Sequence, residues 1–164
     1  LAEKASYFTT QAKDDPVRYV HNEVGYNFRL TNIQAAIGVA QIEQLNGFLV
    51  KKRKIFQIYQ NFIKDKMGIT IAATPPYANN NHWMNILQID TKTYGKDREG
   101  LMRKLADHGI QTRPVWTLNN KQIPYKNSVI YRIEKAEELV ESSLCLPSST
   151  KIDHTHLEKI AELL

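Results

Sequence analysis

An amide and a guanidinium stand two positions apart in the short stretch Tyr26-Asn27-Phe28-Arg29. Alternate side chains of an extended backbone point to opposite sides, so Asn27 and Arg29 share one side. A guanidinium binds phosphate oxygens through charge-assisted hydrogen bonds, and an amide is a further donor, so the pair suits a phosphate group. The alternative is that Asn27 shapes a turn and Arg29 makes a surface ion pair. Taken alone, the local pattern favours this alternative.

A helix is predicted directly after this stretch. Thr31 with Gln34 three residues later forms a capping box, which predicts a helix that begins at Thr31 and a turn that is held at a fixed place. The positive end of the helix favours negative charge nearby. Most of the circumference is apolar, which predicts burial, and Gly38 between alanines predicts close packing by another backbone. We expect the helix to end at Asn46-Gly47.

This region resembles the segment shared by the DegT/DnrJ/StrS family of sugar aminotransferases, which are fold-type-I enzymes that use pyridoxal phosphate. The resemblance covers nearly the whole chain, and it is closest to the subgroup that makes 4-amino-4,6-dideoxy-N-acetylhexosamines on UDP for legionaminic or bacillosamine-type sugars. The matching positions are His21, residues 25–29, 31–38 and 41–42, and further along the chain residues 9–16, 113–116 and 146–149.

The resemblance implies that the chain is the C-terminal part of such an enzyme. Residues 1–46 would end the large cofactor-binding domain, and residues 47–164 would form a small α/β domain. In the family, the lysine that holds pyridoxal phosphate lies upstream, so we expect no catalytic residue in this chain and no activity from it alone. The resemblance also implies a homodimer with shared active sites, in which Asn27 reaches the cofactor phosphate and Arg29 the diphosphate of the nucleotide-sugar. His21 is a further candidate for substrate binding.

A second candidate region is Arg113-Pro114-Val115-Trp116. Proline makes this segment rigid, and the indole supplies a large amphipathic ring. The resemblance places this stretch at the border of the sugar pocket, so Arg113, Trp116 and Asn119 are predicted to bind substrate. The alternative is a strand end with a tryptophan in the core, and the sequence leaves both open.

The predicted reaction of the parent protein is transfer of an amino group from glutamate to a keto-sugar linked to a nucleotide, with UDP-4-keto-6-deoxy-N-acetylhexosamine as the expected acceptor in surface polysaccharide biosynthesis. The competing hypothesis is a non-catalytic basic α/β module that binds nucleic acid or protein. A net charge of +5 fits either one, because a basic surface also suits a diphosphate. The densest basic cluster, residues 51–54, is predicted to be the solvated face of a helix. We therefore expect no nucleic-acid partner.

Composition is that of a globular protein, with 42% hydrophobic and 24% charged residues. No apolar run approaches the roughly 20 residues of a membrane helix, so no membrane partner is expected. Cys145 is the single cysteine, which fits a reducing cytoplasm and a small buried side chain. No metal site is expected, because the four histidines outside the first region show no ligand spacing; they are His82, His108, His154 and His156.

Strands that alternate with helices indicate an α/β or α+β fold for the second part of the chain. Strands are predicted at residues 69–71, 82–89, 110–113 and 144–146. Helices are predicted from residue 47 to about 66, after the cap Asp97, at 133–142, and after the cap Asp153. Residues 117–130 are predicted to be a surface loop.

Overall fold

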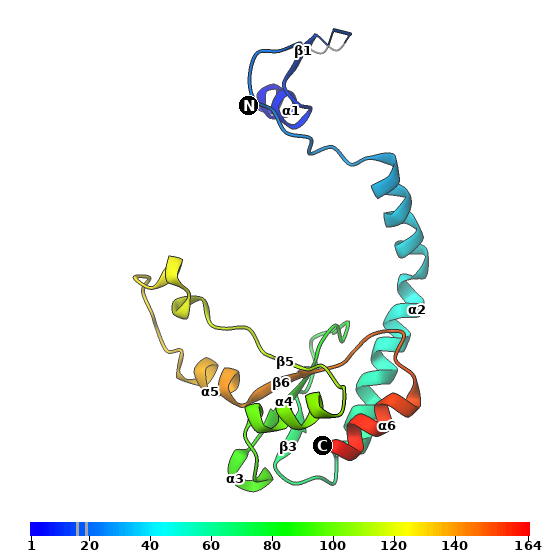
Figure 1. Ribbon diagram of the computed structural model, residues 1–164, viewed down its shortest axis with the longest axis vertical. Helices are drawn as coiled ribbons and strands as arrows, with labels where there is room; N and C mark the ends of the chain where they lie inside the picture. Colours follow the sequence, from blue (N-terminus) through cyan, green and yellow to red (C-terminus); the bar gives the residue numbers. More distant parts are fainter. Residues whose placement is uncertain (16, 19) are drawn as a thin grey trace. The chain divides into compact units, whose positions relative to one another are not determined.

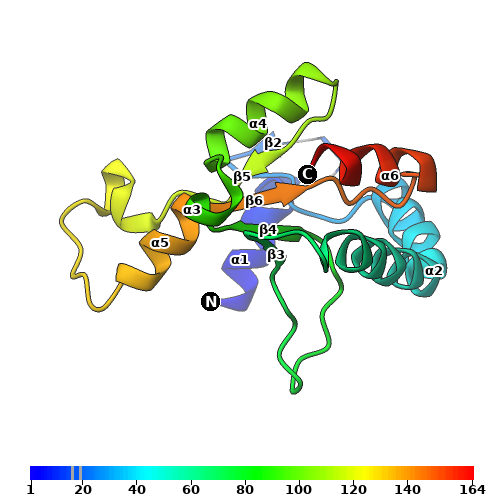
Figure 2. The ribbon, with the colours of Figure 1, turned by 90° about the horizontal axis from the view of Figure 1, so that it is seen from below.

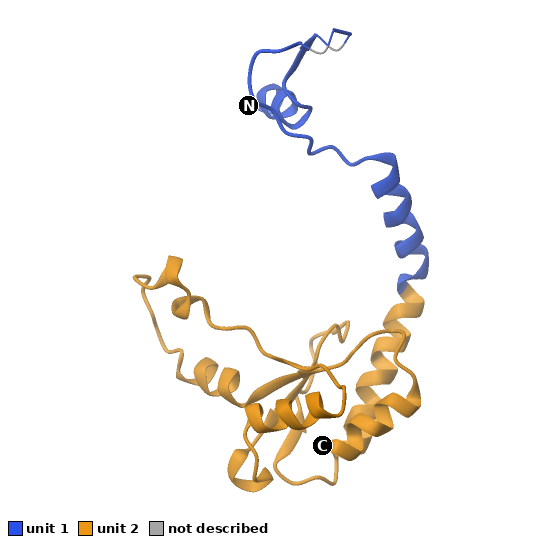
Figure 3. Ribbon diagram, viewed as in Figure 1, with its two compact units in different colours: residues 1–45 blue, residues 46–164 orange. Residues whose placement is uncertain are grey.

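The computed structural model describes residues 1–15, 17–18 and 20–164, and the predictions that involve residues 16 and 19 lie outside them. Contacts divide the chain into two compact units, Leu1–Leu45 and Asn46–Leu164 (Figure 3). The long helix α2 (Asn32–Ile63) contributes its first part to unit 1 and its second part to unit 2.

Unit 1 contains the helix α1 (Ala2–Thr9), a small antiparallel pair of strands, β1 (Lys13–Asp15) and β2 (Val20–His21), and the beginning of α2. The predicted capping box is confirmed. The backbone N–H of Thr31 donates to Gln34 Oε1 over 2.9 Å, and the backbone N–H of Gln34 donates to Thr31 Oγ1 over 3.3 Å. The start of α2 is therefore fixed by side chains as the sequence predicted.

One prediction about α2 is wrong, and a second is not met within this chain. The helix does not end at Asn46-Gly47, because Gly47 keeps a helical backbone instead of the left-handed conformation that a terminating glycine adopts. The beginning of α2 is also not buried within this chain. Ile33 is 74% exposed and Ile42 is 71% exposed, because no described residue covers this apolar surface. A Cβ atom on Gly38 would likewise meet nothing within 4 Å.

Unit 2 is built on an antiparallel sheet with the strand order β3-β4-β6-β5. The short β5 (Arg113–Pro114) lies at an edge, where the missing N–H of Pro114 breaks no ladder. The other strands are β3 (Ile69–Ile71), β4 (Asn85–Ile89) and β6 (Ser143–Leu146). The helices are α3 (Thr91–Tyr94), α4 (Arg98–Asp107), α5 (Glu134–Ser142) and α6 (His154–Leu163), with the 3-10 turns η1 (Asn119–Lys121) and η2 (Ile123–Tyr125) in the predicted loop (Figure 1).

The core of unit 2 lies on one face of this sheet. Alternate strand residues such as Leu87 and Leu144 are fully buried there and pack against α2, α4 and α6. Tyr59, Leu101 and Leu157 are the most buried contributions of these helices. The predicted helix caps are also present, since Asp97 accepts from Gly100 N and Asp153 from His156 N. The α/β fold class is thus confirmed for the described residues.

Two strands begin later than predicted. The strand expected at residues 110–113 is the two-residue β5, which begins at Arg113. The strand expected at residues 82–89 begins only at Asn85, because His82 has a left-handed backbone, with φ +50°. The preceding segment between β3 and β4 extends away from the sheet as a long loop (Figure 2). No helix in the described part of the chain is long and apolar enough to cross a membrane.

Candidate functional site

The turn that carries Asn27 and Arg29 is attached to the end of α1 by backbone hydrogen bonds. The N–H of Tyr26 donates to Phe8 O over 2.7 Å, and the N–H of Phe28 donates to Thr9 O over 3.1 Å. In the reverse direction, the N–H of Gln11 donates to Tyr26 O over 3.1 Å. The turn therefore has a fixed backbone, as the sequence predicted.

Gly25 makes this close attachment possible. A Cβ atom at this position would overlap the backbone of Gln11 and Ala12. Gln11 and Ala12 themselves have φ of 74° and 48°, a left-handed conformation that non-glycine residues adopt only at some cost. The strained bend after α1 and the glycine thus fit against each other, and a larger residue at Gly25 would push the turn away.

The two candidate phosphate ligands are exposed on this turn. The rings of Tyr26 and Phe28 stack, with centroids 5.2 Å apart, so these two side chains share one side of the extended backbone. Because successive side chains alternate, Asn27 and Arg29 lie on the opposite side. Neither Asn27 nor Arg29 makes a side-chain hydrogen bond or ion pair among the described residues. The surface ion pair considered for Arg29 is thus absent from this part of the chain.

His21 is joined to the same backbone. Its Nδ1 lies 2.7 Å from Gln11 O, so Nδ1–H is the donor and Nε2 is left for another partner. Next to it, the Asp14 carboxylate accepts from Asn22 N over 2.8 Å and from Tyr7 OH over 2.9 Å. These hydrogen bonds, above all the one from Asn22 N, lower the pKa of Asp14 below its ordinary value.

The predicted substrate residues of unit 2 do not share one hollow. Arg113 lines a depression of about 180 Å³ together with Ser148, whereas Asn119 lines a separate depression of about 450 Å³. Trp116 is 61% exposed, which rules out the alternative of a core tryptophan. Its ring pairs with Trp83, with centroids 5.8 Å apart.

Trp83 and its surroundings were not predicted from the sequence. Lys52 of α2 was expected to be solvated, but it is half-buried and its ammonium donates to the carbonyl of Ser148 and, over 3.5 Å, to that of Trp83. Burial lowers the pKa of Lys52. The prediction of a solvated face is thus wrong for this lysine, because a long side chain can reach carbonyl groups beyond its own helix.

Comparison with known proteins shows to which family the chain belongs. The model of the DegT/DnrJ/EryC1/StrS aminotransferase family matches residues 1–164. The chain belongs to this family.

Two relatives illustrate the match. EpsN of Bacillus subtilis (strain 168), a protein named as a putative pyridoxal phosphate-dependent aminotransferase, is 32% identical over an alignment of 168 positions. The alignment covers 99% of this chain and 42% of EpsN. GDP-perosamine synthase of Escherichia coli O157:H7 is 32% identical over 162 residues, 99% of this chain and 43% of that protein. The chain therefore spans less than half the length of these relatives.

Solved structures of sugar aminotransferases share the fold. Helicobacter pylori PseC, an aminotransferase involved in the biosynthesis of pseudoaminic acid, superposes with a TM-score of 0.79 at 19% identity, over 98% of this chain and 44% of PseC. DesI, solved in the presence of its TDP-sugar product, gives 0.80 at 23% identity, over 99% of this chain and 41% of DesI.

Pyridoxal phosphate is the cofactor of the DegT/DnrJ/EryC1/StrS aminotransferases. The Asn27 side chain fits the phosphate end of this cofactor, because its amide is an exposed donor, makes no side-chain hydrogen bond among the described residues and stands on a backbone that is held in place. Among the described residues, no group of three or more His, Cys, Asp and Glu side chains is arranged to hold a metal ion.

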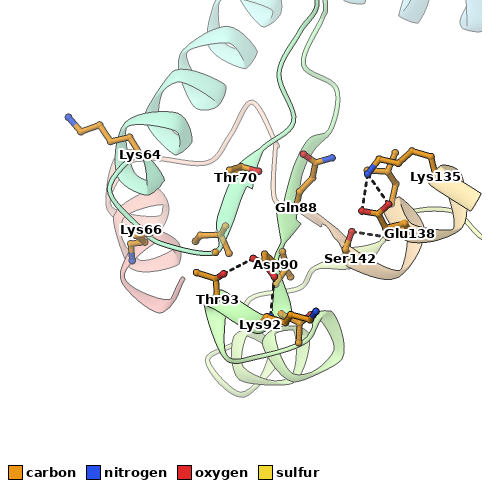
Figure 4. A pocket seen from close by; sticks show the side chains of 15 residues that line it. Lys64, Lys66, Thr70, Gln88, Asp90, Lys92, Thr93, Lys135, Glu138 and Ser142 are labelled. Carbon is orange, nitrogen blue, oxygen red and sulfur yellow. Dashed lines mark hydrogen bonds and ion pairs between the residues drawn. The ribbon is translucent and has the colours of Figure 1, made fainter.

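A further hollow, of about 770 Å³, contains none of the predicted site residues. It lies beside the outer strand β3 and has several lysines on its walls (Figure 4). Its polar groups pair with each other: Lys135 with Glu138, and Asp90 with Thr93 Oγ1 over 2.5 Å. Lys64 points away from the hollow. We assign no function to it.

Proposed function

We propose that the whole protein is a pyridoxal phosphate-dependent aminotransferase that moves an amino group from glutamate to a keto-sugar carried by a nucleoside diphosphate. The observation that carries this proposal is the turn of unit 1 in a chain that belongs to a sugar aminotransferase family. This turn presents Asn27 and Arg29 on a fixed backbone, exposed and without side-chain partners in the described part of the chain. The names of two relatives, which refer to GDP- and TDP-sugars, support a nucleotide-sugar as the substrate class.

Within this proposal the chain binds and orients, and it performs no covalent step. The amide of Asn27 donates to the cofactor phosphate, and the guanidinium of Arg29 holds the diphosphate of the substrate by two parallel hydrogen bonds. Fixing the diphosphate places the sugar carbonyl at a constant distance from the reacting centre, which lowers the entropic part of the barrier. Pyridoxal phosphate, when bound, stabilises the negative charge that develops on the carbon whose amino group is transferred. The lysine that holds the cofactor is predicted to lie elsewhere in the protein.

The finer assignments stay predictions. UDP-4-keto-6-deoxy-N-acetylhexosamine is the expected acceptor, whereas the names of these relatives refer to other nucleotides. A reducing cytoplasm remains the expected location, and Cys145 is indeed buried and free, as a structural cysteine would be. The competing hypothesis of a non-catalytic binding module is disfavoured by family membership.

Replacement of Arg29 tests the assignment of the turn. A charge-assisted hydrogen-bond pair contributes about 1.5 to 3 kcal/mol, so Arg29→Ala should raise KM for the nucleotide-sugar roughly ten- to hundredfold. The half-reaction with glutamate should change little, because no diphosphate takes part in it. Arg29→Lys should restore only part of the affinity, since an ammonium lacks the planar fork. Steady-state and single-turnover kinetics of both half-reactions measure this.

Asn27→Ala is the matched comparison, because it should weaken retention of the cofactor instead of the sugar substrate. If Arg29→Ala impairs both half-reactions equally, or neither, Arg29 is structural and the diphosphate assignment is wrong. Arg18 provides a control of equal charge in unit 1, since its guanidinium pairs with Asp15 over 2.8 Å and is not expected to meet substrate.

We further propose a homodimer with shared sites, supported by the uncovered apolar surface at the beginning of α2. The experiment mixes the full-length Arg29→Ala variant with a full-length variant that lacks the cofactor-binding lysine. Mixed dimers should regain one working site. Absence of recovery, despite subunit exchange shown by a mass or affinity tag, would contradict shared sites.

A further inference from the structure

The pair formed by Trp83 and Trp116 is unusual because both rings are displayed to solvent. Each residue is 61% exposed, yet the rings lie 5.8 Å apart at an interplanar angle of 39°. Neither indole N–H has a hydrogen-bond partner among the described residues. A pair that served only the core would be buried, and its N–H groups would be satisfied.

The backbone of Trp83 is held from both sides. Its N–H donates to Asn81 Oδ1 over 2.9 Å, and its carbonyl accepts from Ser148 Oγ over 2.5 Å and from the Lys52 ammonium over 3.5 Å. The preceding residue, His82, is only 8% exposed and stacks on Phe56 of α2, with ring centroids 4.2 Å apart. The exposed ring of Trp83 thus stands on a backbone to which three other residues are hydrogen-bonded.

The backbone that carries Trp116 has much less support. Residues 115–118 follow the two-residue strand β5 and adopt no regular structure. Among the described residues, the only backbone hydrogen bond of this segment outside regular structure is the one that Leu118 O accepts from Lys121 N over 3.0 Å. Among the aromatic rings of the described residues, that of Trp83 is the one that contacts the ring of Trp116.

We propose that Trp83 is a positioning residue that holds the Trp116 ring as a wall for the hexose ring of the nucleotide-sugar, with Lys52 and Ser148 securing Trp83. This inference rests on the proposed function and on the prediction, implied by the family resemblance, that Trp116 borders the sugar. The chemistry suits a pyranose: the indole faces offer apolar surface to its C–H groups, and the two free N–H groups offer donors to its hydroxyl or N-acetyl oxygens. The contact determines affinity for the sugar, and it takes no part in bond making.

The positioning can be measured without substrate. The full-length protein labelled with 5-fluorotryptophan is studied by ¹⁹F NMR, and the signal of Trp116 is identified by its loss in Trp116→Phe. Trp83→Ala should shift and broaden that signal, and Trp83→Phe, which keeps an aromatic contact, should do so less. Lys52→Met should have an intermediate effect, whereas the neighbouring control Lys51→Met should have none. Tyr77→Ala is the aromatic control, because Tyr77 is 92% exposed in the loop before Trp83.

The consequence for the sugar is measured by a double-mutant cycle on KM for UDP-4-keto-6-deoxy-N-acetylhexosamine. The free energy of an aromatic pair corresponds to roughly a two- to tenfold change in a binding constant. Trp83→Ala should therefore raise KM for the nucleotide-sugar by about that factor. The glutamate half-reaction should be unchanged. In the Trp116→Ala background, Trp83→Ala should add nothing further, because its effect is exerted through the Trp116 ring.

The outcomes separate this inference from the proposed function. An unchanged Trp116 signal in Trp83→Ala, or additive effects of the two alanine variants on KM, would overturn the positioning role while the transferase activity stands. A wild-type protein that aminates no nucleotide-linked keto-sugar would overturn the proposed function and, with it, the sugar contact. If the Trp83→Ala variant does not fold, Trp83→Phe and Lys52→Met provide the same test, with smaller expected changes in the ¹⁹F signal of Trp116 and in KM.

Discussion

Replacing Gly25 by alanine tests whether the turn of unit 1 depends on close contact with the bend after α1. The added methyl group would overlap the backbone of Gln11 and Ala12, so residues 24–28 must move away. That movement disrupts the two hydrogen bonds nearest to Gly25, from Gln11 N to Tyr26 O and from Tyr26 N to Phe8 O. At about 0.5 to 1.5 kcal/mol each, the loss is about 1 to 3 kcal/mol of local stability.

Hydrogen exchange of the Tyr26 and Gln11 amides measures this loss directly. Gly25→Ala should reduce their protection roughly five- to hundredfold. The control is Gly47→Ala, because a Cβ atom there meets nothing within 4 Å, and alanine should stabilise the helix by up to about 1 kcal/mol. Unchanged protection in Gly25→Ala would refute the idea that this glycine fixes the turn. Destabilisation by Gly47→Ala would argue against a continuous α2.

Two further predictions concern single polar groups. Asn85 is 1% exposed, and neither of its side-chain polar atoms has a hydrogen-bond partner among the described residues. Asn85→Leu should therefore raise the free energy of unfolding, measured in urea, by about 1 to 2 kcal/mol. A decrease would show that the amide has partners. The pKa of Asp14 is lowered by its hydrogen bonds, so its stabilisation is present above the ordinary carboxyl pKa near 4 and is lost as pH falls through the folded-state value. The protection of the Asn22 amide, measured as its exchange rate relative to the intrinsic rate at the same pH, should therefore fall in acid, and Asp14→Asn should remove that pH dependence.

Features that depend on residues three or four apart were predicted well from the sequence. The capping pair Thr31 and Gln34 and the caps Asp97 and Asp153 all form, because the donor and acceptor are near each other in any helix that begins there. Gly109 ends α4 for a similar local reason, since its φ of 76° is one that glycine adopts without strain.

Features that depend on distant partners were not predictable in this way. Gly47 is a potential helix end in the sequence, but whether the helix ends there depends on how the next residues pack. Residues 55–63 pack into the core of unit 2 as a continuation of the same helix, so the helix does not end at Gly47. His82 belongs to an apparent strand pattern, yet the side chains of Asn80 and Asn81 take the N–H groups of His82 and Trp83 and turn the backbone away. The paired asparagines were the available signal for this turn.

Lys52 shows why the candidate site of unit 2 is the part that sequence patterns describe least well. Helical periodicity places its Cα on a polar face, but the reach of a four-carbon side chain lets the ammonium approach Ser148, 96 positions later in the chain. The same ammonium also donates to the carbonyl of Trp83, which connects α2 to Trp83 and, through the ring pair, to Trp116. The motif predicts that Trp116 borders a sugar pocket, but it contains no sign of Lys52, Trp83 or Ser148. These residues meet only when the folded chain brings α2, the loop before β4 and the segment after β6 together.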